Sequence, residues 1–218
     1  MTPRRSGPER LATPHGAVVL LELGDDAELD AAFAALPAPE REHAGRLGAI
    51  RRREFVTGRA ALHAAIGDRE APILADDRGA PIVPAGWVGS ISHKGALAAA
   101  IAAPAGGGRV GVDVERAAPP RVDIGRRVLT PREQARLGHL AEGSADRGRA
   151  VTLRFAIKEA IYKAIDPYLR RYVGFTEVEL ELDGEACTVA HALPLAIEAA
   201  WREHAGHWLA TARASERG

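Results

Sequence analysis

The sequence has 218 residues, enough for one generous domain or two small ones. Lys plus Arg equals Asp plus Glu, 29 against 29, so net charge predicts binding to neither nucleic acid nor membrane surfaces. No apolar run is long enough to cross a bilayer, and the single cysteine, Cys187, excludes an intrachain disulfide. These features are typical of a globular protein of the reducing cytoplasm.

The first half of the chain alternates short apolar runs with segments of helical spacing. In chain order we expect a strand at 17–23, helices at 27–36 and 40–66, and strands at 87–92 and 97–102 joined by a tight loop at 93–95. Asp76–Gly79 has the composition of a turn. About 15 residues at the start match no element, so we expect a disordered tail there.

Glycines at 106–108 separate two halves, which we place at residues 1–108 and 109–218. In the second half we expect a strand at 109–115, a helix starting at 130–133, a loop at 141–148, a helix at 151–165 ended by Asp166-Pro167, and a hairpin at 175–190. Residues 197–212 fit a hairpin that turns at Ala205-Gly206, with a helix as the alternative.

The strand at 109–115 carries two acidic residues on one face. Alternation places Asp113 and Glu115 opposite the valines, roughly 7 Å apart along the strand. Two carboxylates this close repel each other unless a cation lies between them. Gly111 on the same face leaves room for a ligand or metal to approach the backbone. The plain alternative is a half-exposed strand with an acidic outer face.

A third carboxylate occurs on the helix at 151–165. Helical spacing puts Phe155, Glu159, Tyr162 and Lys163 on one face. Only three of the 29 basic residues are Lys, and two of them lie in this short segment. A surface ion pair between Glu159 and Lys163 would explain it, worth about 0.3–0.5 kcal/mol. Alternatively, Glu159 completes an oxygen-ligand site for Mg²⁺ with the two strand carboxylates.

Two segments of the first half have the composition of anion sites. Gly89–Gly95 combines hydroxyl, imidazole and ammonium groups at a strand end, which suits a phosphate. Arg51–Arg59 contains four arginines on a helix, more than Glu54 can neutralise. Arginine forks could clamp a nucleotide phosphate there, although a solvated helix face is the usual explanation for such a run.

Together these segments resemble the Sfp-type 4′-phosphopantetheinyl transferases, particularly members like enterobactin synthetase component D. The resemblance rests, in chain order, on residues 53–63, 89–93, 111–115, and 155–164 followed by Gly174-Phe175. It covers the middle two thirds of the chain. Phe155 stands where many members have Trp, and Ala80 where some relatives have Lys.

The resemblance implies an α+β fold of two similar α/β halves related by a pseudo-twofold, with the active site and coenzyme A in the cleft between them. It also implies the reaction, in which a carrier-protein serine attacks the β-phosphate of coenzyme A and 3′,5′-ADP leaves. Asp113, Glu115 and Glu159 would hold Mg²⁺ against the pyrophosphate. Glu159 would also be the general base, unless a metal-bound water shares that duty, and Lys163 would contact the phosphates.

For coenzyme A itself, the resemblance implies a second set of residues. Ser92 and His93 would bind the 3′-phosphate, and Arg53 and Arg59 would lie around the adenosine end. Lys158 and Lys163 would complete the coenzyme-binding set.

The predicted partners are coenzyme A and an apo acyl or peptidyl carrier protein, with no nucleic acid or membrane. Arg126–Arg136 is a basic segment next to Val128 and Leu129, and such a patch suits the acidic surface usual in carrier proteins. The resemblance favours a broad range of secondary-metabolism carriers, and two internal halves make a monomer sufficient. Two alternative functions stay open: another Mg²⁺-dependent phosphoester enzyme, and an inactive module that binds coenzyme A or a carrier.

Overall fold

The computed structural model describes residues 7–184 and 186–217. Its contacts divide the chain between Val110 and Gly111 into two compact units. Each unit combines an antiparallel sheet with one long helix, so the α+β class expected from the sequence is confirmed. No helix among the described residues has the length and apolar character needed to cross a membrane.

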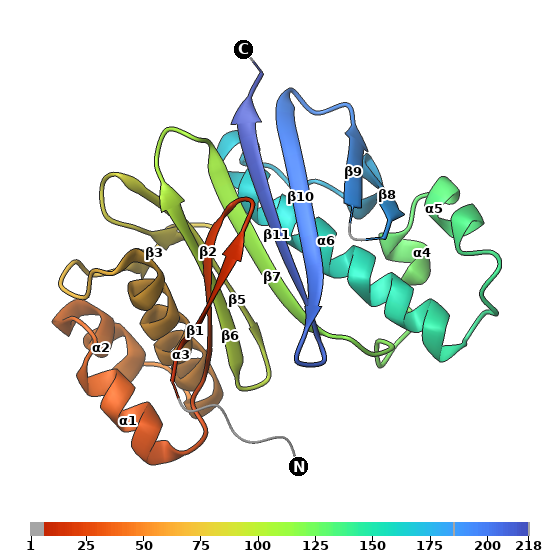
Figure 1. Ribbon diagram of the computed structural model, residues 1–218. Coiled ribbons are helices and arrows are strands. Elements are labelled where there is room, and N and C mark those ends of the chain that lie inside the picture. Colours follow the sequence, from red (N-terminus) through yellow and green to blue (C-terminus); the bar gives the residue numbers. More distant parts are fainter. Residues whose placement is uncertain (1–6, 185, 218) are drawn as a thin grey trace. The chain divides into compact units, whose positions relative to one another are not determined.

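The first unit is a four-stranded sheet with a long helix packed against it (Figure 1). Its elements are β1 (Glu9–Thr13), β2 (Gly16–Glu22), α1 (Asp26–Ala34), α2 (Ala38–Gly45), α3 (Ala49–Ile66), β3 (Leu74–Ala75), β4 (Pro81–Ile82), β5 (Trp87–Lys94) and β6 (Leu97–Pro104). The strand order is β1-β2-β6-β5, and each neighbouring pair is antiparallel. Val19, Leu21 and Ala100 from the sheet form the core with Val56 and Leu62 of α3.

Three expectations for this unit were wrong. Residues 9–13 form β1, paired with β2 through Leu11 and Val18, where a disordered tail was expected. The helix expected at 40–66 is two helices: α2 ends at Gly45, and Gly48, whose backbone is extended with ψ 157°, is the N-cap from which α3 begins. His93 and Lys94 belong to β5, so the turn lies beyond them at Gly95, whose φ is +64°.

In the second unit, a 25-residue helix lies along a three-stranded sheet of order β10-β11-β7 (Figure 1). The elements are β7 (Arg109–Arg116), α4 (Gly125–Val128), α5 (Pro131–Arg136), α6 (Ala145–Leu169), the short 3₁₀ helix η1 (Phe175–Glu177), β8 (Val178–Asp183), β9 (Ala186–His191), β10 (Leu195–His204) and β11 (His207–Glu216). Strands β8 and β9 form a separate hairpin.

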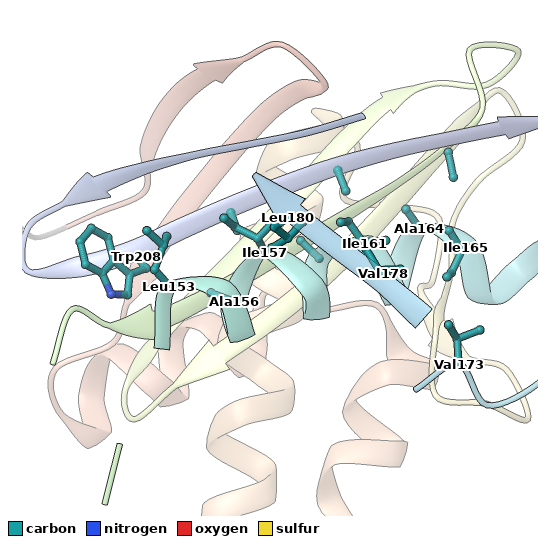
Figure 2. Packing of buried hydrophobic residues seen from close by; sticks show 14 of the residues in the cluster. Leu153, Ala156, Ile157, Ile161, Ala164, Ile165, Val173, Val178, Leu180 and Trp208 are labelled. Carbon is teal, nitrogen blue, oxygen red and sulfur yellow. The ribbon is translucent and has the colours of Figure 1, made fainter. Parts of the chain in front are cut away.

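The core of the second unit is built on α6. Ile157, Ile161 and Ala164 project from the helix in one row, and Val178 and Leu180 of β8 pack beside them (Figure 2). All five side chains are buried. This spacing of apolar residues sets which face of α6 is buried in the core. Glu159 and Lys163 therefore project from other faces of the helix.

The hairpins and the capped helix of the second unit are confirmed, but both ends of α6 were placed wrongly. Thr130 and Glu133 form the expected capping box, and β10 and β11 pair around Ala205 and Gly206, both at positive φ. Helix α6 begins at Ala145, because the Ser144 side chain caps it inside the expected loop. It also continues through Pro167, which lies in the last turn, where a missing N–H removes only one helical hydrogen bond.

Candidate active site

The site begins where β7 lies directly against α6. A methyl group built on Gly111 would lie 2.9 Å from the Ala164 nitrogen and would overlap the Ala160 carbonyl oxygen. The space beside Gly111 is therefore filled by the helix, and the expectation that it admits a ligand is wrong. Because strand residues two apart share a face, this contact brings Asp113 and Glu115 towards the same helix.

Lys163 of α6 reaches across to β7. Its ammonium donates hydrogen bonds to Asp113 Oδ1 at 2.8 Å and to the Val112 carbonyl at 2.9 Å. The Asp113 side chain is only 6% exposed, so the pair is well shielded from water. The resemblance implied a phosphate contact for Lys163, and the plain alternative was a surface ion pair with Glu159, one turn earlier on the same helix. The strand carboxylate takes the ammonium instead.

The three predicted carboxylates lie close enough to affect one another. Burial raises the pKa of Glu159 above its ordinary value, the charge of Asp113 raises it further, and Glu115 adds to the effect. Lys163 and Arg127 oppose this rise without cancelling it. The second unit therefore collects negative charge around Glu159 that a divalent cation would neutralise.

The fit to magnesium rests on the chemistry of these donors. All three are carboxylates, which are the hard oxygen ligands that Mg²⁺ prefers. Among the described residues, no three His, Cys, Asp or Glu side chains already stand as a metal-holding group. Asp113 instead keeps its ion pair with Lys163. The residue types fit the metal, and the binding geometry is left to an experiment.

Lys158 does not fit its expected role in coenzyme binding. Its side chain is 2% exposed, and its ammonium donates to Glu133 Oε2 at 2.7 Å, to the Val128 carbonyl at 2.8 Å and to the Phe175 carbonyl at 3.0 Å. A lysine ammonium has three N–H donors, so none is left for a phosphate. Burial lowers the pKa of Lys158, and the hydrogen bond that Lys158 donates to Glu133 partly offsets that change.

Beside Glu159 the second unit contains a cavity of about 160 Å³ that sequence reasoning missed. Its walls are mainly apolar and aromatic, and come from Ile161, Ile165, Tyr162, Tyr172, Val173, Phe175 and Val178. Arg127 lies on the wall near Phe175, with its guanidinium carbon 5.9 Å from the ring centre. Gly174-Phe175, one of the segments on which the family resemblance rests, forms part of the wall of this cavity. The sequence did not show that a space lies between that wall and α6.

In the first unit, Ser92 and His93 do not form a joint cradle. They are neighbours in a strand, so their side chains project to opposite faces of the sheet. His93 faces α3, where a methyl group on Gly58 would overlap its ring. Ser92 is buried on the other face, as Ser90 is. A shared phosphate would have to lie at the strand end to reach both side chains.

The arginines of α3 have acidic or carbonyl partners within the first unit. Arg53 bonds the Leu23 carbonyl at 3.0 Å and Asp26 at 2.7 Å, so an anion would have to displace the Asp26 carboxylate. Arg59 is buried, donates to the Ile73 carbonyl at 2.6 Å and stacks over Phe55. Burial lowers its pKa to about 10, although Glu40 opposes the change. Their coenzyme-binding roles stay predictions.

A buried pair formed by His63 and Glu40 was not expected from the sequence. His63 Nδ1 lies 2.7 Å from the Asp68 carbonyl, which can only accept, so this nitrogen carries a proton. Nε2 lies 2.8 Å from Glu40 Oε1. Burial alone lowers the pKa of His63, but the hydrogen bonds and charges of Glu40 and Asp68 outweigh it, so the pKa is raised.

This pair predicts a loss of stability in mild alkali. A histidine whose folded pKa is raised stabilises the fold fully below its unfolded pKa, about 6.5, and less as pH rises through the folded value. We expect the melting temperature to fall as the pH rises above about 6.5, by about 2–4 °C for each kcal/mol lost. His63→Gln should melt lower at pH 6 and show a flatter pH profile. Parallel profiles for the two proteins would contradict the assignment.

The fold and site define an α+β protein with three carboxylates and a lysine gathered where β7 meets α6. A family model described as the 4′-phosphopantetheinyl transferase N-terminal domain matches residues 40–103, and one for the 4′-phosphopantetheinyl transferase superfamily matches residues 109–213. The chain belongs to the 4′-phosphopantetheinyl transferase superfamily, and the resemblance found in the sequence is confirmed.

Three curated relatives show the extent of the similarity. The 4′-phosphopantetheinyl transferase Svp of Streptomyces mobaraensis is 35% identical over 153 residues, which are 68% of this chain and 62% of that protein. PptT of Mycobacterium tuberculosis is 31% identical, with 69% and 67% covered. Enterobactin synthase component D of Escherichia coli O157:H7 is 32% identical, with 64% of each covered. The match to Svp thus spans less than two thirds of that relative's length.

Proposed function

We propose that this protein transfers the 4′-phosphopantetheine arm of coenzyme A to a serine of an apo acyl or peptidyl carrier protein, giving holo carrier and 3′,5′-ADP. One observation carries the proposal: Glu159, with a raised pKa, lies among Asp113, Glu115 and Lys163 at the edge of a cavity. The names of the matched relatives support the same reaction class.

The residues divide the chemistry between them. Glu159 is the carboxylate placed to take the proton of the incoming serine hydroxyl; its pKa is raised in the metal-free protein, and a bound cation would lower it. The serine oxygen then bonds to the β-phosphorus, and the bond to the leaving 3′,5′-ADP oxygen breaks. Lys163 sets a positive charge beside the phosphates. Magnesium, held by Asp113, Glu115 and Glu159, would neutralise charge that develops on the phosphoryl oxygens.

The cavity beside Glu159 suits the pantetheine arm. That arm is a flexible chain with apolar segments and two amides, and such groups bind in concave, mainly apolar sites with a few polar groups. The walls from Ile161, Tyr162 and Phe175 have this character, and Glu159 lies at their edge. An arm bound there would place its terminal phosphate near the carboxylates. For the adenosine end, Arg53, Arg59, Ser92 and His93 are retained as predictions from the family resemblance.

We propose that the carrier protein docks on the basic segment at 126–136, and that Arg126 is the residue of this segment that tests the proposal best. Arg136 already lies 3.3 Å from Glu181, and Arg127 lines the cavity, so neither is a clean probe. Arg126 is exposed, and near it Val122 is 72% exposed. A basic side chain next to an apolar anchor suits an acidic partner surface.

Arg126→Glu is therefore expected to raise the KM for the carrier about 10-fold and to leave the KM for coenzyme A unchanged. Reversing a charge at an interface costs encounter rate and affinity together. Steady-state kinetics with each substrate varied in turn measures both constants. Arg46→Glu, an exposed charge reversal just after the end of α2, serves as the control. Equal shifts in the two constants would show that Arg126 does not mark the carrier surface.

The proposed function is tested by the identity of the released product. Incubation with an apo carrier, coenzyme A and Mg²⁺ should release one 3′,5′-ADP for each holo carrier formed, as measured by chromatography. Phosphate release without any carrier would favour another phosphoester enzyme. Tight binding of coenzyme A without turnover would favour an inactive binding module.

A further inference from the structure

A buried ion pair joins five elements of the second unit: α4, α5, α6, η1 and β8. Lys158 of α6 and Glu133 of α5 lie 2.7 Å apart, with side chains 2% and 0% exposed. Glu133 Oε2 also accepts the Thr130 amide at 2.7 Å, and Oε1 accepts the Leu180 amide at 2.8 Å. The remaining two donors of Lys158 bind the Val128 and Phe175 carbonyls. Every polar group of the pair is therefore used within the protein.

These partners are the supports of the cavity next to Glu159. Val128 follows Arg127, Phe175 is itself a wall, and Leu180 continues the strand that supplies Val178. Lys158 immediately precedes Glu159 on α6. The pair therefore ties the wall from α4 and the wall from η1 and β8 to the helix that carries the proposed base.

Stability alone is a weak reason to keep such a pair. Burying two charges costs several kcal/mol each, and well-packed apolar substitutes are often equally stable or more so. What an apolar pair cannot reproduce is the set of directed hydrogen bonds to three separate backbone segments. A displacement of about 1 Å in such a support can cost about 100-fold in rate.

We propose that Glu133 and Lys158 are positioning residues that hold the walls of the cavity in register with Glu159. The predicted loss in kcat/KM rests on the proposed function. The predicted change in hydrogen exchange does not, because it is measured without any substrate. The positioning role also replaces the coenzyme-binding role expected for Lys158. Lys158 also lines the cavity, but all three of its N–H donors are used within the protein, so both residues act through Phe175, Val128 and the α6 backbone.

Two variants separate positioning from stability. Glu133→Gln keeps the shape and one acceptor oxygen, whereas the double variant Glu133→Gln/Lys158→Met removes both charges and leaves no unpaired ion. We expect the double variant to melt closer to wild type than Glu133→Gln does, because it leaves no unpaired charge, and to lose about 10–100-fold in kcat/KM. The KM for the carrier should not change. Glu40→Gln is the matched control, because Glu40 is also 0% exposed and its Oε1 is also hydrogen-bonded to a backbone amide and to a basic side chain, His63.

The structural readout is hydrogen exchange of peptides covering residues 172–180, followed by mass spectrometry. Faster exchange there in Glu133→Gln, and not in Glu40→Gln, is expected whether or not the protein has transferase activity. Unchanged exchange in this segment would overturn the proposal. A double variant with wild-type kcat and KM would overturn it as well. Wild-type protein without activity would count against the proposed function alone, and the exchange result would still decide on positioning.

Discussion

Glu159→Gln is expected to lower kcat/KM for transfer by about 1,000-fold or more while leaving the protein at least as stable as wild type. The rate falls because a neutral amide can neither accept the serine proton nor hold a cation, and general-base catalysis alone contributes about 100–10,000-fold. Stability is retained because burial and Asp113 disfavour the ionised carboxylate, so removing its charge relieves repulsion.

The measurement pairs transfer kinetics with thermal melting at pH 8. At that pH the wild-type protein bears the cost of ionising Glu159, since a carboxyl with a raised folded pKa destabilises the fold above its unfolded pKa. Glu198→Gln, an exposed change on β10, is the control and should alter neither quantity. A large loss of melting temperature in Glu159→Gln would show that the residue is structural, and the role of proposed base would fall.

Gly111→Ala is expected to be the most destabilising single-methyl change near the site. The added methyl would overlap the Ala160 carbonyl and lie 2.9 Å from the Ala164 nitrogen, and backbone atoms of a helix cannot rotate away as a side chain can. Overpacking costs typically 1–3 kcal/mol, and we expect about 3 kcal/mol or more here. That corresponds to a fall of about 6–12 °C in melting temperature.

The comparison variant is Gly45→Ala in α2, where nothing lies within 4 Å of the added methyl. It should be neutral or slightly stabilising, because alanine is the better helix former. Calorimetry or circular dichroism melts of both variants decide the matter. If Gly111→Ala melts with wild type, β7 and α6 are further apart than described, and the close approach that brings Asp113 to Lys163 is wrong.

Local patterns predicted most of the secondary structure. The alternation of Val110–Glu115 gave β7, and Thr130 with Glu133 gave the capped start of α5. These features depend on neighbours within four residues, which the sequence displays directly. The errors at α6 arose where a local pattern was ambiguous. The N-cap Ser144 lies in a polar stretch that resembles a loop, and Pro167 was interpreted as the end of the helix although it lies in the last turn.

Contacts between distant residues could not be predicted. Lys158 and Glu133 are 25 positions apart, so one sequence could not show that the lysine is buried in an ion pair. Arg53 likewise forms an ion pair with Asp26 of α1, which the sequence could not show. This ion pair makes the Arg53 guanidinium less available to bind a phosphate. Gly111 was correctly singled out, but its neighbour proved to be a helix backbone and not a ligand.

One part of the candidate site, its three carboxylates, could be predicted from the sequence for a physical reason. Strand alternation and helical spacing are enough to select Asp113, Glu115 and Glu159, and the raised pKa of Glu159 reflects first its burial and then the charges of Asp113 and Glu115. The cavity beside them was missed because its walls come from α4, α6, η1, β8 and residues 172–174, which only the folded chain brings together.

The most direct test of the account is the intact mass of an apo carrier protein after incubation with this protein, coenzyme A and Mg²⁺. We predict a mass gain equal to one phosphopantetheine arm, lost when EDTA is present and restored by added Mg²⁺. No gain across a panel of apo acyl and peptidyl carriers, with properly folded protein, would contradict the proposed transfer. A gain that persists in EDTA would contradict the magnesium role of the three carboxylates.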